Sequence, residues 1–179
     1  MFIHEMTGDE CRSALQKASV GRLGCARANQ PYVVPIYFAF DGEHLYGFAT
    51  VGQKIEWLRT NQRVCLEIDE RISHNQWTSV IVLGRYEELP DEPQYEAARI
   101  QAHQMLQRRA MWWEPAYLSN AHRDSPHSFV PVFFRIKIAQ MTGHRATPDM
   151  VEVPTPDVTH QIGKESWVDS ILRHIGMKN

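Results

Sequence analysis

The sequence has little cysteine and little net charge. Its three cysteines, Cys11, Cys25 and Cys65, are too far apart in the sequence to suggest a metal-binding or redox pair. We therefore expect reduced and mostly buried thiols, as is usual for proteins of a reducing compartment. The formal net charge of −2 gives no general attraction to nucleic acid or to an anionic membrane. Neither is expected as a partner.

Long apolar segments are missing as well. The first ten residues, MFIHEMTGDE, are too short and too polar for a signal peptide, and no apolar run approaches the length of a membrane span. These features predict a cytoplasmic protein. A hydrophobic content of 43% with 22% charged residues is ordinary for a globular chain, and 179 residues are enough to bury a core as one domain.

The common catalytic signatures are also absent. The sequence contains no G-x-S-x-G motif, no Cys/His nucleophile signature, no P-loop and no Rossmann fingerprint. It has nine histidines, but their spacing and neighbours do not match a metal-ligand set, so we expect no metal site. The residues alone therefore identify no catalytic group.

Strand patterns occupy most of the chain between residues 20 and 139. Alternating or continuous apolar residues predict strands at 20–28, 32–40, 44–49, 63–69, 77–88 and 129–139. Asp41-Gly42 predicts a two-residue hairpin turn of type I′. We expect residues 70–76 to form a polar loop, and Gly84 to mark a bulge or a close approach.

Three helical segments accompany these strands. Thr7 and Glu10 have the spacing of a capping box for a helix that ends near residue 19. A short helix over residues 53–59 carries Ile55 and Leu58 on one buried stripe. A third helix, at 94–109, is expected to turn Tyr95, Ala98, Ala102, Met105 and Leu106 inward. After residue 147, three prolines predict an extended tail, and residues 165–175 have the apolar spacing of a final helix.

The start of the short helix has the chemistry of an anion site. The first N–H groups of a helix lack partners within the helix, and the aligned peptide dipoles make that end positive. Thr50 can donate a hydroxyl hydrogen, Gly52 allows close approach of the backbone, and Lys54 adds a full positive charge. The same spacing also fits a solvated lysine at the start of a surface helix, and both interpretations stay open.

Several motifs, taken in order, resemble one family. They are Val33-Val34-Pro35-Ile36-Tyr37-Phe38, Gly52-Gln53-Lys54 through Cys65, Ser79 to Gly84, and Met141-Thr142-Gly143. Over residues 5–145 the chain resembles the pyridoxamine 5'-phosphate oxidase-like FMN-binding split β-barrels, and among them the branch of nitroimidazole-resistance proteins. The resemblance implies a mainly β fold, with a six-stranded, antiparallel, Greek-key-like barrel and flanking helices over residues 1–146. The extended tail and its helix would then occupy residues 147–179.

The resemblance also implies a homodimer with FMN at its interface. Thr50 and Lys54 would hold the phosphate, and Gln53 would help at the phosphate or the ribityl chain. The other implied cofactor-binding residues are Val34, Pro35, Ile36, Tyr37, Phe48 and Ala49 in the same chain, with Trp77 and Ser79 from the partner chain. Many relatives in the nitroimidazole branch have His at the position of Phe48, and often a basic residue or His at that of Gln53. Two simpler interpretations stay open, with Pro35 at a strand edge or bulge and Trp77 as a plain interface or core aromatic.

The function implied by the resemblance is that of a small FMN-dependent oxidoreductase acting on a nitro-aromatic or related electron-poor compound. A flavin carries the redox chemistry itself, so such an enzyme needs no protein base. One alternative is a non-catalytic module that binds flavin or haem, with His144 or a histidine of the tail as a candidate axial ligand. Another is a cofactor-free interaction protein that uses the aromatic loop around Trp112-Trp113 and the C-terminal helix.

Overall fold

The structure, a computed structural model, describes residues 1–109 and 131–148. They lie in one unit, Met1–Asp149. Its strands are β1 (Phe2–Glu5), β2 (Val20–Arg27), β3 (Gln30–Phe40), β4 (His44–Thr50), β5 (Arg63–Ser73), β6 (Gln76–Glu88) and β7 (Pro131–Thr147). Its helices are α1 (Gly8–Lys17), α2 (Gln53–Thr60) and α3 (Glu96–Gln107), with a short 3₁₀ turn, η1 (Pro93–Tyr95), before α3.

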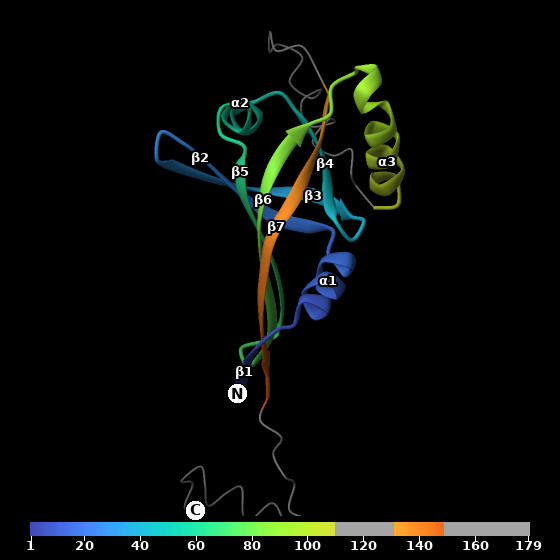
Figure 1. The fold of residues 1–179 in the computed structure, drawn as a ribbon. Helices are drawn as coiled ribbons and strands as arrows, with labels where there is room; N and C mark the ends of the chain where they lie inside the picture. The colour runs from blue at the N-terminus through green and yellow to red at the C-terminus, as the bar shows by residue number, and fades with distance from the viewer. Residues whose placement is uncertain (110–130, 149–179) are drawn as a thin grey trace, which may run out of the picture. The chain divides into compact units, whose positions relative to one another are not determined.

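The strands close into a barrel. Their order is β1-β7-β4-β3-β2-β5-β6, with all neighbours antiparallel, and β6 also pairs with β7. Through this second pairing the six strands from β2 to β7 form a closed ring. The strand β1 lies outside the ring and pairs with residues 144–147 of β7 (Figure 1). The predicted six-stranded antiparallel barrel is therefore confirmed.

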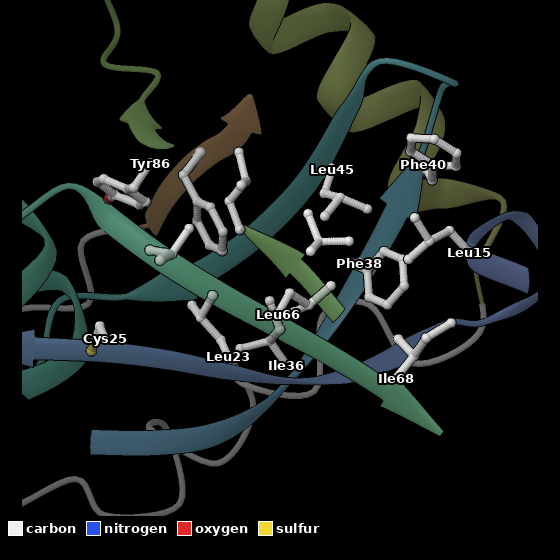
Figure 2. Packing of buried hydrophobic residues seen from close by; sticks show 14 of the residues in the cluster. Leu15, Leu23, Cys25, Ile36, Phe38, Phe40, Leu45, Leu66, Ile68 and Tyr86 are labelled. Carbon is white, nitrogen blue, oxygen red and sulfur yellow. The ribbon is translucent and has the colours of Figure 1, made fainter. Parts of the chain in front are cut away.

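Alternate residues of the six barrel strands point into the barrel. Side chains such as Leu23, Ile36, Phe38 and Leu66 meet in its interior (Figure 2), and each is 5% exposed or less. The helix α2 adds Ile55 and Leu58 to the same core, as its spacing predicted. The predicted inward face of α3 is also confirmed: Ala102 and Leu106 are buried, and Tyr95, Ala98 and Met105 pack beside them.

Local signals for the first helix and for the bulge are confirmed. The Thr7 hydroxyl accepts a hydrogen bond from the Glu10 N–H at 3.3 Å, and the Glu10 carboxylate accepts one from the Thr7 N–H at 2.9 Å. At Gly84 the register between β6 and β7 shifts by one residue. A Cβ there would lie 2.7 Å from the carbonyl oxygen of Lys137, so the bulge leaves no room for a side chain.

The turn between β3 and β4 is not the predicted type I′ turn. That type needs positive φ at both central residues, and here only Gly42 has it, at 108°. The Asp41 carboxylate instead accepts hydrogen bonds from two backbone N–H groups of the turn, at 2.7 and 2.8 Å, and holds a longer loop. A two-residue turn with positive φ at both positions does occur between β2 and β3, at Ala28 (50°) and Asn29 (65°).

Some strands extend beyond the predicted ends. Residues 70–73, predicted to be loop, belong to β5, and β7 runs through Met141-Thr142-Gly143 to Thr147. The strand β1 was not predicted at all. Residues 70–72 of β5 and most of β1 are exposed, so they carry no apolar alternation. Pairing with β6 and β7, and not burial, determines their conformation.

Several predictions fall outside the described residues. These are residues 129–130 of the last predicted strand, the loop around Trp112-Trp113, and the tail beyond residue 148 with its helix. All three cysteines are described, and they are free thiols: Cys11 and Cys25 are buried and Cys65 is half-buried, as expected. No helix in the described ranges combines the length and apolar character needed to span a membrane.

Candidate functional site

The strand β3 has an open edge. It pairs with β2 along residues 30–37, but it pairs with β4 only through Phe38, Ala39 and Phe40. Within the described residues, positions 30–37 therefore have no strand on the β4 side. The Phe38 N–H points the other way, to the Ser19 carbonyl oxygen at 3.0 Å. Because backbone groups alternate along a strand, those of Pro35 and Tyr37 turn toward the open edge.

This edge explains how Pro35 fits inside a long strand. A proline cannot donate to a sheet ladder, so it is tolerated where no neighbouring strand needs its N–H. The missing donor of Pro35 lies on the side that β4 does not cover. The interpretation of Pro35 as an edge residue is confirmed. Its carbonyl faces the same side, where a ligand could reach the backbone of β3.

The start of α2 lies next in the chain after β4. The strand β4 leaves β3 after Gly47 and continues along β7 to Thr50. Two residues later Gly52 is the N-cap of α2, and no side chain of residues 1–109 or 131–148 caps the helix. A Cβ on Gly52 would meet no atom of the described residues within 4 Å, so none of them fills the space in front of this helix end. Uncapped N–H groups at an open helix end are suited to an anion.

Lys54 lies at this helix end as a half-buried cation. It forms no hydrogen bond or ion pair with another residue in the part of the chain that the structure describes. Burial lowers its pKa below the ordinary value, and the Cys25 thiol opposes this shift to a lesser degree. As the second residue of α2, Lys54 also lies where the helix dipole disfavours a positive charge. A bound anion would offset both costs.

The structure places the remaining predicted residues in two groups. Pro35 is exposed and Val34 and Tyr37 are half-exposed along the open edge, and Thr50 and Gln53 flank Gly52. The side chains of Ile36, Phe48 and Ala49 are instead buried. Phe48 contacts Phe133 edge-on, with 5.0 Å between ring centroids. Because these three side chains are buried, we expect Ile36, Phe48 and Ala49 to contact a ligand mainly through their backbone atoms.

Trp77 and Ser79 lie far from α2 within one chain. Both belong to the part of β6 that pairs with residues 144 and 146 of β7, near β1, and α2 lies at the other end of the barrel (Figure 1). One chain therefore does not bring these two residues to Lys54. If they contact the same ligand, they do so from a second copy of the chain.

A cavity of about 560 Å³ lies elsewhere. It is lined by α1, the turn between β3 and β4, and the middle of β7, and none of the predicted site residues is part of it.

Three residues beside Lys54 were not predicted. Trp57 follows Lys54 by one helical turn, and its ring lies 5.5 Å from that of Tyr32, centroid to centroid. Tyr32 is paired across the sheet with Cys25, the neighbour of Lys54. The spacing of Lys54 and Trp57 could have indicated part of this cluster. The register of Cys25 with Tyr32 follows only once the turn at Ala28 and Asn29 is known.

Comparison with known proteins gives consistent matches. The family model described as pyridoxamine 5'-phosphate oxidase matches residues 7–145. An uncharacterized protein of Rhizobium meliloti (strain 1021) is 40% identical over 146 residues, which are 82% of this chain and 97% of that protein. The crystal structure of an FAD-binding protein from Mesorhizobium loti is also 40% identical, covers 83% of this chain and 99% of its own, and has a TM-score of 0.67. A structure described as a 5-nitroimidazole antibiotic resistance protein of Bacteroides thetaiotaomicron is 19% identical, with a TM-score of 0.56 and coverage of 81% and 89%.

Proposed function

Because the chain belongs to the pyridoxamine 5'-phosphate oxidase family, we propose that it binds a flavin between the open edge of β3 and the start of α2. The family resemblance seen in the sequence is confirmed. Its relation to the nitroimidazole-resistance proteins is distant, since 19% identity shows a shared fold alone. The sequence predicts FMN, and the relative from Mesorhizobium loti is named an FAD-binding protein. Both flavins contain an isoalloxazine ring, a ribityl chain and a phosphate next to that chain.

The observation that carries the proposal is Lys54 at the start of α2, where no described residue pairs with the ammonium or caps the helix. A half-buried lysine that pairs with no carboxylate of the described residues lowers the stability of the fold unless a ligand supplies a negative charge. Here the charge, the free helix N–H groups and an open approach at Gly52 occur together. A phosphate group satisfies all three.

The remaining residues have separate roles in binding. The Thr50 hydroxyl and the Lys54 ammonium donate to the phosphate, and Gln53 donates or accepts beside it. The backbone of β3 from Pro35 to Tyr37 faces the flavin ring. When bound, the flavin supplies the electron transfer, and the protein residues hold and orient it. We propose oxidoreductase activity toward a small electron-poor compound such as a nitro-aromatic.

A homodimer is the second part of the proposal. The outer face of β3, β2, β5 and β6 carries Val33, Ile81 and Leu83, which are 62%, 41% and 44% exposed. Val33 and Leu83 belong to one cross-strand row through Gly24 and Cys65. Apolar side chains exposed on one face of a sheet favour association. The outer face also continues along β6 to Trp77 and Ser79, which a second copy would bring to the flavin.

Flavin titration of the purified protein tests the proposal. FMN and FAD are added separately, and binding is followed by flavin fluorescence and by the rise in melting temperature that a bound ligand produces. The variant Lys54→Ala should weaken binding by about tenfold or more. Lys17→Ala, which removes an exposed lysine from the last turn of α1, is the matched control and should bind as the wild type does.

The same experiment separates the alternative functions. Haem bound by the purified protein would give a Soret band, and His144, exposed on β7 opposite Ser79, is the ligand to replace in that case. A protein that stays colourless with either flavin or haem would contradict the flavin proposal. Such a result would favour the role as an interaction protein.

A further inference from the structure

We propose that the flavin of this chain is a dinucleotide whose adenine stacks on an aromatic pair formed by Tyr32 and Trp57. The proposal rests on the proposed function and concerns the part of the ligand beyond the first phosphate. It is argued from the accessible ring surface and polar groups of this pair, from its position next to Lys54, and from the length of the open edge of β3.

The aromatic pair offers a ring surface with polar groups. The two ring centroids are 5.5 Å apart and the planes meet at 56°. Both side chains are half-buried at the rim of the main core, so part of each ring is accessible. Across residues 1–109 and 131–148, neither the Tyr32 hydroxyl nor the Trp57 indole N–H forms a hydrogen bond with another side chain or the backbone. Such a surface suits a purine base, which stacks on aromatic rings and accepts hydrogen bonds at its edge.

The pair adjoins the cation of the proposed phosphate site. Trp57 follows Lys54 by three residues on α2, so the two side chains share a face of the helix. Tyr32 is paired with Cys25, whose thiol interacts electrostatically with the Lys54 ammonium. The same flank of α2 is tied to the β2 end by the Asn61 amide, which donates to the Ala26 carbonyl oxygen at 2.9 Å. Positive charge and aromatic surface are thus next to one another.

The open edge of β3 is long enough for both halves of a dinucleotide. The ring is predicted to lie along Val34 to Tyr37, and Tyr32 lies on the same strand at the side toward Gln30. From Tyr37 to Tyr32 the edge extends about 17 Å, at about 3.4 Å per residue. A flavin with its phosphate at Lys54 and its ring toward Tyr37 leaves Tyr32 uncovered. The second phosphate and the adenosine of a dinucleotide would continue in that direction.

Comparison of FAD with FMN on matched variants tests this inference. The wild type should bind FAD about tenfold or more tightly than FMN. Trp57→Leu, which keeps an apolar side chain against the core, should weaken FAD binding by about tenfold or more and leave FMN binding unchanged. Trp57→Phe keeps a ring and should retain most of the preference for FAD. Tyr95→Leu, in the turn before α3, is the aromatic control and should change neither affinity.

Adenosine provides a test on the wild type that does not depend on the folding of a variant. Adenosine should compete with FAD and leave FMN binding unchanged, because it lacks the phosphate and the isoalloxazine ring. Equal affinity of the wild type for the two flavins would overturn the inference, and so would equal loss of both in Trp57→Leu. If neither flavin binds, the proposed function itself fails. If both bind and Lys54→Ala weakens both, that function stands whatever the adenine result.

Discussion

Replacing Lys54 with methionine should stabilise the ligand-free protein and weaken flavin binding at the same time. Methionine has a similar unbranched shape, so the substitution leaves little cavity. Both residues are favourable in a helix. The change therefore removes mainly the positive charge at the start of α2. A lysine whose role is structural would give the opposite sign for stability.

The expected magnitude follows from the position of the charge. At the second residue of α2 the helix dipole disfavours a cation by about 0.3–1 kcal/mol. Partial burial adds to this cost, since no carboxylate among the described residues pairs with Lys54. We expect Lys54→Met to raise the free energy of unfolding by about 1 kcal/mol, or the Tm by about 2–4 °C. A charge-assisted hydrogen bond to phosphate contributes about 1.5–3 kcal/mol, so the flavin Kd should rise about 10- to 100-fold.

The stability difference should also depend on pH in a definite direction. The pKa of Lys54 is lowered in the folded state, mainly by burial. Between this folded-state pKa and the ordinary lysine value of 10.5, the unfolded chain binds more protons than the folded one. The wild type therefore gains stability from Lys54 as the pH rises through that window, and Lys54→Met does not. The advantage of the variant is largest below the window and is lost above 10.5.

Urea denaturation without ligand, followed by flavin titration, measures both effects. Lys17→Met is the control, because Lys17 lies in the last turn of α1, where the dipole favours a cation. That variant should lose a few tenths of a kcal/mol of stability and keep its flavin affinity. If Lys54→Met is less stable than the wild type, the Lys54 ammonium has a stabilising partner and is not an uncompensated charge. An unchanged flavin Kd would remove Lys54 from the phosphate site.

Three further predictions concern the scaffold. Gly47→Ala should lower the free energy of unfolding by about 3 kcal/mol or more in denaturant titration, because the new Cβ would overlap the Phe134 ring. Gly52→Ala is the control: its Cβ would meet no described atom within 4 Å, and the variant should unfold like the wild type. Burial opposes the shift, but backbone N–H groups and a tyrosine hydroxyl lower the pKa of Asp41 overall. The stability that the ionised Asp41 contributes is therefore fully present above the ordinary value of 3.8 and is lost as the pH falls through the folded-state pKa. Asp41→Asn should therefore show a flatter acid limb in a plot of stability against pH, and an unchanged limb would contradict this. Thr7→Ala removes the capping box of α1 and should lower stability by about 1 kcal/mol by urea denaturation, where no loss would show that the cap is not needed.

Much of the barrel could be predicted because its strands are buried on one face. Val64, Leu66 and Ile68 alternate with less buried residues in β5, and the same rule held for Val80 and Val82 in β6. The rule fails beyond the barrel. Residues 70–73 of β5 and the strand β1 form by pairing alone and leave no apolar pattern. For β1 the partner, β7, lies at the other end of the described chain, so the local sequence does not specify that strand.

The candidate site could be predicted only where its chemistry is local. Thr50, Gly52 and Lys54 lie within five residues and precede a helix, so the sequence could indicate an anion site. The aromatic pair of Trp57 and Tyr32 could not be predicted, because the two residues are far apart in the sequence and only the fold brings their rings together. The turn type mattered as well. Asp41-Gly42 attracts a type I′ prediction, yet the Asp41 carboxylate holds a longer loop, and the two-residue turn forms at Ala28 and Asn29 without glycine.

The open edge of β3 and the position of the proposed anion site both follow from one divergence between strands. Gly47 is the last residue of β4 that pairs with β3, and its missing side chain admits the Phe134 ring. Beyond it β4 stays with β7, so β4 does not cover the backbone of β3 at Pro35, and the chain reaches Gly52 and α2. If a strand paired with β3 at Pro35, its carbonyl would need an N–H donor that proline does not have. The fold therefore retains a strand edge that a ligand can cover without breaking a ladder pairing of β3 with β2 or β4.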